Sequence, residues 1–509
     1  MLPSLVLLTV ALAQQPMQDS AYSRTEAMIP MRDGVKLHTV IVAPRNAAGP
    51  LGILMDRTPY GADGAAAGAA HNAGYLGLSG LIIVAQDIRG RFTSEGTFAM
   101  NRPPHSGPQG TDESTDTYDT IDWLVKNVPG NNGRVGVFGI SYPGWLTAVA
   151  GIGAHPALKA ISPQAPMGDA WMGDDFFHQG AFRQSYGLEY SWMMEASPDL
   201  SVTPSPARFD TYEWYRSFPT LGALAAAVGA EQWPTWRHFA EHPAYDSVWR
   251  ARSLPRYFTH TTVPTLTVGG WWDQEDEYGP LASYAALEKT DTAGVNFLVM
   301  GPWYHGQWFA DSATALGNIR FGRPTGVDFR ALQTRWFAYW LKGEGDGKFP
   351  EATVFDAGTN EWRSFDRWPP AAAQTKHLYL RENGGLSFDP PTAATGADQY
   401  VSDPAHPVPY RPLPTQPPVE RDVALLVPAG VSAEAVSAVL ARAAGPLLDR
   451  LAVFDEYHGP GVPAGHRSVA WHCTFRDPVR TLREREVDEL LAGALQALEN
   501  ELGVRRREG

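Results

Sequence analysis

Short continuous runs of apolar residues recur through the first 300 positions, and polar clusters follow several of them. The run GLIIVAQD at 80–87 is apolar without alternation, as is typical of a strand buried on both faces of a sheet. Two similar runs occupy 263–270 and 295–301, and a segment with helical spacing, TYDTIDWLVKN, precedes them. Strands that alternate with helices predict an α/β fold with a mostly parallel sheet, whose functional site lies along the carboxyl edge of the strands.

The pattern changes twice further along the chain. Residues 176–261 are aromatic and helix-like without a clear strand, so we expect a helical cap inserted between two strands and lying over the site. The predicted α/β core therefore comprises 20–175 and 262–348. From about residue 350, short β-like pieces lead to a Pro-rich segment at 403–418, which indicates a linker at a domain boundary.

Beyond the linker, residues 419–509 show a β-α-β-β-α-β order of elements. The last helix is predicted to begin with a capping box formed by Thr481 and Glu484. The apolar residues of this helix recur at helical spacing, at Val487, Leu490, Leu491, Ala494, Leu498 and Leu502. This order predicts a self-contained α+β domain of the ferredoxin-like class.

Composition and charge narrow the function classes. Hydrophobic residues make up 44% of the chain and charged residues 19%, as in globular proteins. The net charge of −14 argues against a nucleic-acid-binding protein overall, because phosphate contacts need clustered Lys and Arg. The single cysteine, Cys473, excludes an internal disulfide.

The first 13 residues form a short apolar run that ends in Ala11-Leu12-Ala13, a small-residue pattern typical of signal-peptide cleavage. We expect a signal peptide at 1–13 and a periplasmic or secreted protein. The alternatives are an apolar strand and a mis-called start; with a mis-called start the protein would be cytoplasmic, as the C-terminal domain would suggest. No stretch is long enough to span a bilayer, so no membrane partner is expected.

The segment GISYPGW at 139–145 has the features of a serine nucleophile on a sharp turn, although it misses the G-x-S-x-G spelling by one place. Ser141 follows the strand-like VGVFG and precedes a segment that can form a helix. Gly139 and Gly144 give the room that a close strand–helix turn needs. The backbone N–H of Tyr142 stays free to donate to an oxyanion.

Two further polar residues complete a predicted catalytic triad. Asp273 follows the strand-like run 263–270, and His305 follows the run 295–301. A serine nucleophile needs a base and an orienting acid, and on this architecture they occur in the chain order Ser, Asp, His. The sequence therefore predicts that Ser141, Asp273 and His305 meet at the carboxyl edge of the sheet.

Six motifs in order resemble one hydrolase family: RTPYG, QDIRGRFTSEG, GISYPG, WMGDDFFHQGA, GGWWDQEDEYG and GPWYHGQW. They are similar to those of the cocaine-esterase-like (CocE/NonD) and X-Pro dipeptidyl-peptidase hydrolases. Within this group they look most like the α-amino-acid ester hydrolases, whose elbow is spelled G-x-S-Y-x-G. The resemblance covers about 20–400 and implies an α/β-hydrolase fold with a helical cap.

The resemblance also implies a role for each site residue. Ser141 would be the nucleophile, His305 the general base and acid, and Asp273 the residue that orients the imidazole. The hydroxyl of Tyr60 would be the second oxyanion donor, beside the N–H of Tyr142. No metal and no organic cofactor would be needed.

A cluster of three carboxylates that holds the α-ammonium of the substrate distinguishes this subgroup, and Asp175, Glu275 and Asp276 match it by position. A cationic amine that enters a partly desolvated pocket needs compensating negative charge, which supports the assignment independently. The adjacent Asp174 is the alternative to Asp175. An acidic run such as DQEDE is, taken alone, usually a solvated loop.

The implied reaction is acyl transfer from an α-amino-acid ester, or from the side-chain amide of an amino-β-lactam, through an acyl-serine. The alternatives within the enzyme class are a cocaine-esterase-like esterase, a glutaryl-type acylase and an X-Pro dipeptidyl-peptidase. The expected partner is a small-molecule substrate, and members of the family often form homo-oligomers.

Family members normally continue into a complete jelly-roll domain, whereas here 350–415 would hold a truncated jelly-roll segment and the linker. Residues 419–509 instead resemble the ferredoxin-fold anticodon-binding domain of the phenylalanyl-tRNA synthetase β chain. They contain eleven Arg against fourteen Asp and Glu, so we expect weak tRNA binding at best. A hypothesis from another class is therefore a tRNA-binding module fused to an incomplete hydrolase. A local basic patch could comprise Arg467, Arg476, Arg480, Arg483, Arg505, Arg506 and Arg507.

Overall fold

The computed structural model describes residues 21–72, 74, 78–104, 110–204, 210–381, 385–391, 418–459, 461–477 and 480–507. The predicted signal peptide and nearly all of the Pro-rich linker lie outside these ranges. The chain divides into two compact units, Met1–Gln399 and Tyr400–Gly509, and each is described by itself. Within the described ranges, no helix has the length and apolar character needed to cross a membrane.

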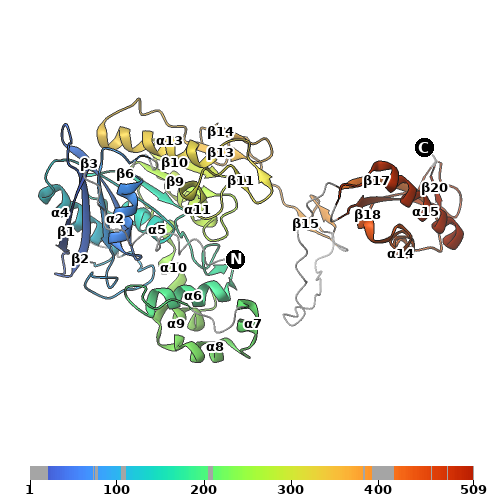
Figure 1. The fold of residues 1–509 in the computed structure, drawn as a ribbon, viewed down its shortest axis with the longest axis horizontal. Helices are drawn as coiled ribbons and strands as arrows, with labels where there is room; N and C mark the ends of the chain where they lie inside the picture. Colours follow the sequence, from blue (N-terminus) through green and yellow to red (C-terminus); the bar gives the residue numbers. More distant parts are fainter. Residues whose placement is uncertain are drawn as a thin grey trace. The chain divides into compact units, whose positions relative to one another are not determined.

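The first unit is built on one ten-stranded sheet with the order β1-β2-β4-β3-β5-β6-β9-β10-β13-β14 (Figure 1). Adjacent strands from β4 to β13 run parallel, while β1, β2 and β14 pair antiparallel to their neighbours. The strands are β1 (Tyr22–Pro30), β2 (Lys36–Pro44), β3 (Leu51–Thr58), β4 (Ile82–Asp87), β5 (Asn131–Ile140), β6 (Leu158–Gln164), β9 (Thr265–Gly270), β10 (Asn296–Gly301), β13 (Ala352–Asp356) and β14 (Glu361–Phe365).

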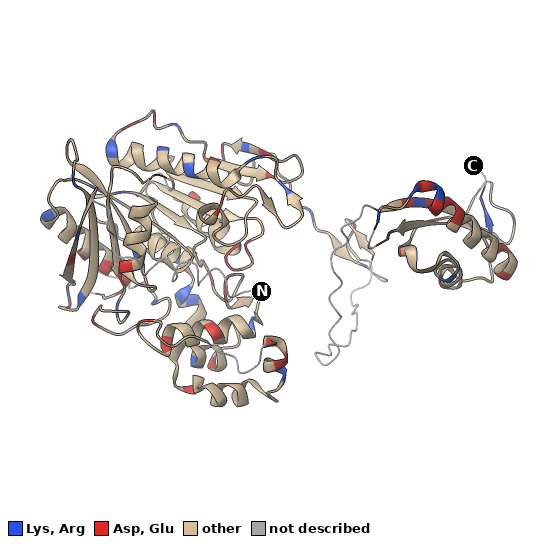
Figure 2. Ribbon diagram, viewed as in Figure 1, with Lys and Arg blue, Asp and Glu red and all other residues tan. Residues whose placement is uncertain are grey.

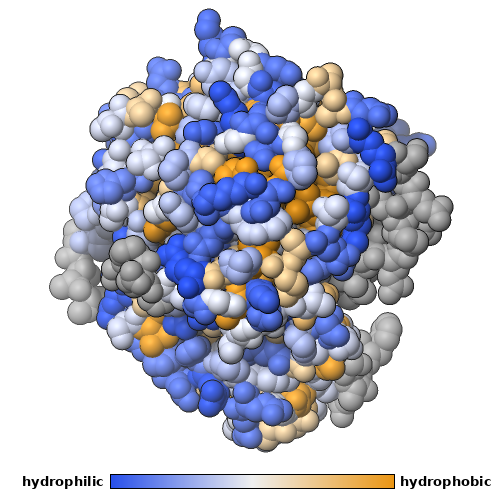
Figure 3. All heavy atoms as spheres, turned by 90° about the vertical axis from the view of Figure 1, so that its left-hand side faces the viewer, coloured by the Kyte–Doolittle hydropathy of each residue, from blue (hydrophilic) through white to orange (hydrophobic). Residues whose placement is uncertain are grey.

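Helices cover both faces of this sheet, which explains the apolar runs without alternation. In β5, Phe138 packs into the core cluster on one face, whereas Val135 and Val137 pack into the cluster on the other. The helices are α2 (Ala62–His71), α4 (Glu113–Asn127), α5 (Tyr142–Ala150), α11 (Tyr278–Glu288), α12 (Gln307–Ala310) and α13 (Thr325–Phe337). The face of the molecule seen in Figure 3 is mostly hydrophilic, with small apolar groups near its centre. The predicted α/β-hydrolase fold is confirmed.

The register of the sheet brings the ends of distant strands to one level. Ile140 at the end of β5 pairs with Gln164 of β6, and Gln164 pairs with Val268 of β9. Gly270 and Gly301, the last residues of β9 and β10, pair with each other. The segments that follow β5, β9 and β10 therefore leave the sheet along the same edge.

The predicted jelly-roll segment is the main point at which the structure differs from the sequence analysis. Residues 352–356 form β13, which pairs in parallel with β10 and extends the main sheet. Since β14 pairs with β13, the core continues to Phe365, beyond the predicted end at 348. Ala352 and Val354 are buried against residues of β10, which explains the pairing. Of the described residues beyond β14, β15 (Tyr379–Leu380) and β16 (Leu386–Ser387) form a separate two-stranded hairpin.

The helical cap lies between β6 and β9, and Figure 1 shows its helices in green on one side of the core. A cluster of buried aromatic residues, including Phe177, Trp214, Trp236, Phe239 and Trp249, holds it together and explains the aromatic pattern of the sequence. The sequence did not predict the hairpin of β7 (Phe177–His178) and β8 (Ala181–Phe182) at its start. The cap helices are α6 (Gln184–Glu195), α7 (Thr211–Arg216), α8 (Leu221–Val228), α9 (Pro234–Glu241) and α10 (Ser247–Arg252).

The second unit has the predicted β-α-β-β-α-β order, and its fourth and last strand is short. Its antiparallel sheet has the order β18-β19-β17-β20, and both helices contribute to one core. The predicted capping box at Thr481 is wrong: Glu486 accepts from the N–H of Arg483 and pairs with Arg480, so the last helix begins at Glu484. The elements are β17 (Val419–Pro428), α14 (Ala433–Ala444), β18 (Leu448–Tyr457), β19 (His466–Phe475), α15 (Glu484–Leu502) and β20 (Arg505–Arg506).

Candidate active site

Ser141 lies on a sharp turn between β5 and α5, as the sequence predicts. Its backbone has φ 67° and ψ −126°, a left-handed conformation that non-glycine residues rarely adopt. Two hydrogen bonds hold the turn: the N–H of Ser141 donates to the carbonyl of Gln164 at 3.0 Å, and the N–H of Trp145 donates to the carbonyl of Ser141 at 2.8 Å. The strained turn places the serine at the carboxyl edge of the sheet, at the N-terminus of a helix.

Glycine is required at two positions around this serine because neighbouring backbone atoms lie too close for a side chain. A Cβ atom at Gly139 would lie 2.6 Å from the backbone of Pro143, and one at Gly144 would lie 2.2 Å from the carbonyl oxygen of Gln164. The glycine that comes one place later than in the common spelling therefore faces the neighbouring strand β6. The turn accepts no side chain at either position without a backbone shift.

Tyr142 is the first residue of α5, where a backbone N–H has no acceptor within the helix. Its side chain is fully buried, and its hydroxyl accepts from the N–H of Asn101 at 2.9 Å. The side chain is thus occupied in the core, and the backbone N–H is the group of Tyr142 that is suited to an oxyanion.

Asp273 and His305 form a tight pair at the same sheet edge. The Nδ1–H of His305 donates to both carboxylate oxygens of Asp273, at 2.9 and 3.0 Å. Asp273 also accepts from the backbone N–H groups of Glu275 and Asp276, at 2.9 Å each. Although burial alone raises the pKa of Asp273, the charge of His305 and these hydrogen bonds hold it below its ordinary value. The carboxylate therefore fixes the ring with Nε2 directed away from Asp273.

The other ring nitrogen of His305 contacts an acid. Its Nε2 lies 3.4 Å from Oε2 of Glu275, and among the described residues Ser141 Oγ makes no hydrogen bond to the imidazole. Burial alone would lower the pKa of His305, but the charges of Asp273 and Glu275 outweigh it and raise this pKa to about 10. The imidazole of the unliganded protein is thus predominantly charged.

The three predicted ammonium ligands lie together beside this imidazole. The N–H of Asp175 donates to the carbonyl of Glu275 at 2.8 Å, which joins the segment that leads into the cap to the segment after β9. Asp175 and Asp276 are buried, yet Oδ1 of Asp175 and both carboxylate oxygens of Asp276 have no hydrogen-bond partner among the described residues. Buried polar atoms are normally paired, so this arrangement points to a missing donor.

The structure distinguishes Asp174 from Asp175. Asp174 is buried, and its two carboxylate oxygens accept from the backbone N–H groups of Gly168, Asp169 and Gly279, each at 2.8 Å. Both oxygens of Asp174 are therefore engaged, and they join the loop after β6 to the start of α11. Asp175 retains an unpaired oxygen and is the better ammonium ligand of the two.

Burial and mutual repulsion disfavour the ionised form of the cluster. Burial first, and then the charge of Glu275, raises the pKa of Asp175 to about 7. Burial and the charges of Asp175 and Asp174 raise the pKa of Asp276 well above its ordinary range. A cation held among these carboxylates would supply the charge and the donors that the site lacks.

Tyr60, the predicted second oxyanion donor, follows β3 and is half-buried. Its hydroxyl lies 2.6 Å from the hydroxyl of Tyr190 on cap helix α6. Burial, and to a smaller extent the charges of Asp175 and Glu275, raise the pKa of Tyr60, so the phenol stays protonated and able to donate.

The family model of the X-Pro dipeptidyl-peptidase (S15) family matches residues 33–307, which is more than half of the chain. The chain belongs to this family. The cocaine esterase of Rhodococcus sp. (strain MB1 Bresler) is 30% identical over 422 residues, covering 77% of this chain and 70% of that protein. The relationship predicted from the six motifs is thus confirmed, and its relatives are serine hydrolases.

Two solved structures of the same fold are similar over most of this chain. An aminopeptidase from the marine sediment archaeon Thaumarchaeota archaeon is 42% identical with a TM-score of 0.71, covering 79% of this chain and 68% of that chain. An α-amino acid ester hydrolase is 34% identical with a TM-score of 0.70, covering 90% of this chain and 82% of that chain.

The second unit has different relatives. The family model of the ferredoxin-fold anticodon binding domain matches residues 414–507, which confirms the predicted class. The phenylalanine–tRNA ligase beta subunit of Thermotoga maritima is 38% identical over 98 residues, which are 19% of this chain and 12% of that protein. Most of the ligase is unmatched, so this likeness concerns the domain alone.

Two tyrosines of the cap were not predicted as site residues. Tyr186 donates to Oε2 of Glu275 at 2.8 Å, and its ring stacks on that of Tyr190 with the centroids 5.8 Å apart. The guanidinium of Arg183 lies over the ring of Tyr186, 4.5 Å from its centroid. The tyrosines are four residues apart on α6, a spacing that places them on one helix face and was the available signal.

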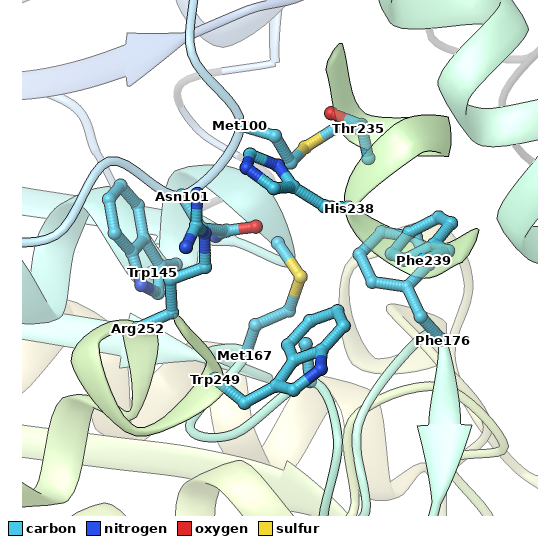
Figure 4. Close-up of a pocket in the computed structure, with 11 residues that line it drawn as sticks. Met100, Asn101, Trp145, Met167, Phe176, Thr235, His238, Phe239, Trp249 and Arg252 are labelled. Atoms are coloured by element: carbon cyan, nitrogen blue, oxygen red, sulfur yellow. The ribbon is translucent and has the colours of Figure 1, made fainter. Parts of the chain in front are cut away.

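A pocket between cap and core adjoins helix α5 in this S15-family protein (Figure 4). Its lining includes Trp145, one turn after Ser141, and Phe176, directly after Asp175. Asn101 is buried in its wall, and its Nδ2 has no partner among the described residues. The remaining labelled lining residues are Met100, Met167, Thr235, His238, Phe239, Trp249 and Arg252.

Proposed function

We propose that this S15-family chain is a serine hydrolase of α-amino acyl compounds, namely α-amino-acid esters and the side-chain amides of amino-β-lactams. The observation that carries the proposal is the set of unpaired, buried carboxylate oxygens of Asp175 and Asp276 beside the Asp273–His305 pair. A protonated α-amino group would donate to these oxygens while the adjacent acyl carbon lies near Ser141. The 34% identity to an α-amino acid ester hydrolase supports the same substrate class.

In the proposed reaction His305 Nε2 accepts the proton of Ser141 Oγ, and the oxygen attacks the acyl carbon. The carbonyl oxygen becomes an oxyanion, which accepts from the N–H of Tyr142 and from the hydroxyl of Tyr60. His305 then donates its proton to the departing alcohol or amine, which leaves the acyl group on Ser141. Water, activated by the same imidazole, releases the acid, or an amine such as a β-lactam nucleus takes the acyl group instead.

The first test compares phenylglycine methyl ester with its N-acetylated form. Acetylation removes the positive charge but keeps the ester, so the protein should hydrolyse the free amine faster. Ser141→Ala should abolish turnover of both. Equal rates for the two esters in the wild-type protein would exclude ammonium recognition, and a cocaine-esterase-like esterase would then be the better assignment.

Single substitutions test which carboxyl groups recognise the amine of the substrate. Asp175→Asn and Asp276→Asn each remove one carboxyl group of the cluster and should raise KM for the free amine more than for the acetylated ester. The matched control is Glu277→Gln, a nearby acid that is exposed and has no ion pair among the described residues. Equal losses on both substrates in the two cluster variants would contradict the assignment of the cluster.

A second candidate is peptide hydrolysis at a free amino terminus, since the chain is 42% identical to a solved aminopeptidase. The same ammonium pocket would serve both reactions, and the leaving group distinguishes them. Cleavage of dipeptide amides at a rate comparable to that of the ester would favour this candidate. A chain that cleaves esters and leaves peptides intact would favour the esterase.

We infer that tRNA binding by the second unit is weak. Several arginines of the expected basic patch are neutralised by ion pairs, and Figure 2 shows blue and red positions interspersed in this unit. These pairs are Arg467–Glu456 at 3.5 Å, Arg476–Asp449 at 3.2 Å, Arg480–Glu486 at 2.9 Å and Arg505–Glu499 at 2.9 Å. Binding of tRNA by the full chain that weakens steeply with salt, together with failure of a fluorophosphonate to label Ser141, would favour the tRNA-binding alternative.

A further inference from the structure

The contact between Glu275 and His305 is at odds with the use of His305 as a base. A general base must present a neutral Nε2 to the serine hydroxyl. Here Nε2 lies 3.4 Å from Oε2 of Glu275, a distance that fits an ion pair when the imidazole is protonated. Glu275 therefore occupies the ring nitrogen that Ser141 needs.

Other groups hold Glu275 in this position. Tyr186 donates to the same oxygen, Oε2, at 2.8 Å, and Gln274 donates to Oε1 at 3.0 Å. The unpaired oxygens of Asp175 and Asp276 belong to the same cluster. A cation that enters the cluster would thus bind to Glu275 together with these two residues, and would compete with His305 for its carboxylate.

We propose that Glu275 keeps His305 protonated in the unliganded protein, and that the α-ammonium of the substrate releases the imidazole by taking over this carboxylate. The inference rests on the proposed function and deepens it. The ammonium enters, and the proton on Nε2 leaves to solvent because the charge that held it is now shared with the substrate. The neutral Nε2 then accepts the proton of Ser141 Oγ, and acylation proceeds as above. The presence of the amine therefore changes the rate of acylation as well as the affinity for the substrate.

The charged groups around His305 also favour the protonated form of its imidazole in the unliganded protein. From the segment after β9, Asp273, Glu275 and Asp276 face the ring, with Asp276 Oδ2 3.8 Å from Nδ1. From the segment that leads into the cap, Asp175 adds negative charge. Arg183 is the nearby cation, but its guanidinium is directed to the carbonyl of Asp175 and to the ring of Tyr186. Among the described residues, carboxyl groups thus outnumber cationic side chains around His305.

The size of the effect follows from the pKa of His305. Because the pKa of His305 is raised to about 10, the neutral imidazole is a small minority at pH 7.5. Because one adjacent charge changes a pKa by about 1 to 3 units, neutralising Glu275 should raise the neutral fraction tenfold or more. A substrate without the amine should react slowly for this reason, even at saturation.

The test uses the full chain and two chromogenic amides, phenylglycine p-nitroanilide and its analogue without the amine, phenylacetyl p-nitroanilide. The pH dependence of kcat reports the pKa of the base in the enzyme–substrate complex. We expect the acid limb of kcat to lie at least one pH unit lower for the amine than for the analogue. In Glu275→Gln the two limbs should converge, and kcat for the analogue at pH 7.5 should rise tenfold or more. Glu277→Gln, the matched control, should keep the wild-type gap.

The proposal is overturned if the acid limbs of kcat for the two substrates coincide in the wild-type protein. It is also overturned if Glu275→Gln leaves the separation between these limbs unchanged. If KM is lower for the amine while the limbs coincide, this inference fails and the proposed function stands. If the protein does not distinguish the amine in KM or in kcat, the proposed function itself fails.

A second measurement needs no variant. Methylammonium chloride should accelerate labelling of Ser141 by a neutral fluorophosphonate at pH 7.5, compared with sodium chloride at the same ionic strength. The small cation occupies the carboxylate cluster and leaves the acyl site open. Equal labelling rates in the two salts, at concentrations at which methylammonium inhibits hydrolysis of the amine substrate, would contradict the release of His305.

Discussion

Gly144 offers a sharp test of how the turn around Ser141 is built. A Cβ atom in Gly144→Ala would lie 2.2 Å from the carbonyl oxygen of Gln164, more than 1 Å short of an ordinary contact. Both groups are backbone or are attached directly to it, so neither can move alone. The carbonyl of Gln164 is also the acceptor for the N–H of Ser141, at 3.0 Å. A shift that relieves the contact must therefore displace the serine.

The magnitudes follow from these contacts. Overpacking of a filled interior costs about 1–3 kcal/mol, which outweighs the gain of about 1 kcal/mol that alanine normally brings to a helix. Displacement of a reacting group by about 1 Å costs on the order of 100-fold in rate. Gly144→Ala should therefore lose about 1–2 kcal/mol of stability and on the order of 100-fold in kcat.

The matched control is Gly68→Ala in α2, where a Cβ atom meets nothing within 4 Å. That change should stabilise the first unit by about 0.5–1 kcal/mol and leave kcat unchanged. Urea unfolding followed by tryptophan fluorescence reports on this unit, because all but one of the seventeen tryptophans precede residue 400. If Gly144→Ala keeps kcat within threefold of the wild-type value and loses no stability, the close approach of α5 to β6 does not position Ser141.

Three further predictions concern single side chains. Asp273→Asn removes the acceptor that orients His305, so kcat should fall by on the order of 1,000-fold or more with the fold intact by circular dichroism. Burial raises the pKa of Asp56 to about 8, so the folded state keeps this proton and loses stability as pH rises from about 4 to 8. Urea unfolding at pH 4 and pH 8 should show a smaller loss of stability in Asp56→Asn than in the wild-type protein. Leu498→Ala should cost the second unit about 2–5 kcal/mol, measured by amide exchange of α15, and a smaller change would mean that the core collapses around the cavity.

The sequence was informative where a residue's role follows from its neighbours in the chain. Ser141, Asp273 and His305 each follow a buried strand within a few residues, and the parallel sheet brings these strand ends to one edge. The local pattern therefore predicted the sheet edge at which all three residues lie, while their meeting as a triad stays a prediction. The strand β13 was misassigned because it has five residues, and its place depends on pairing with β10 about fifty residues earlier.

The choice between Asp174 and Asp175 shows why other parts of the site could not be predicted. Neighbouring residues of the same type have opposite roles because Gly279, more than one hundred positions away, donates its N–H to the first and not to the second. Tyr186 and Tyr190 escaped prediction for the same reason, since their partners Glu275 and Tyr60 lie on other segments and the cap must pack before the pairs exist. A sequence pattern identifies groups capable of chemistry, but it does not show which of them the backbone has already satisfied. In this site the groups left unsatisfied, at Asp175 and Asp276, are the ones on which substrate recognition is proposed to depend.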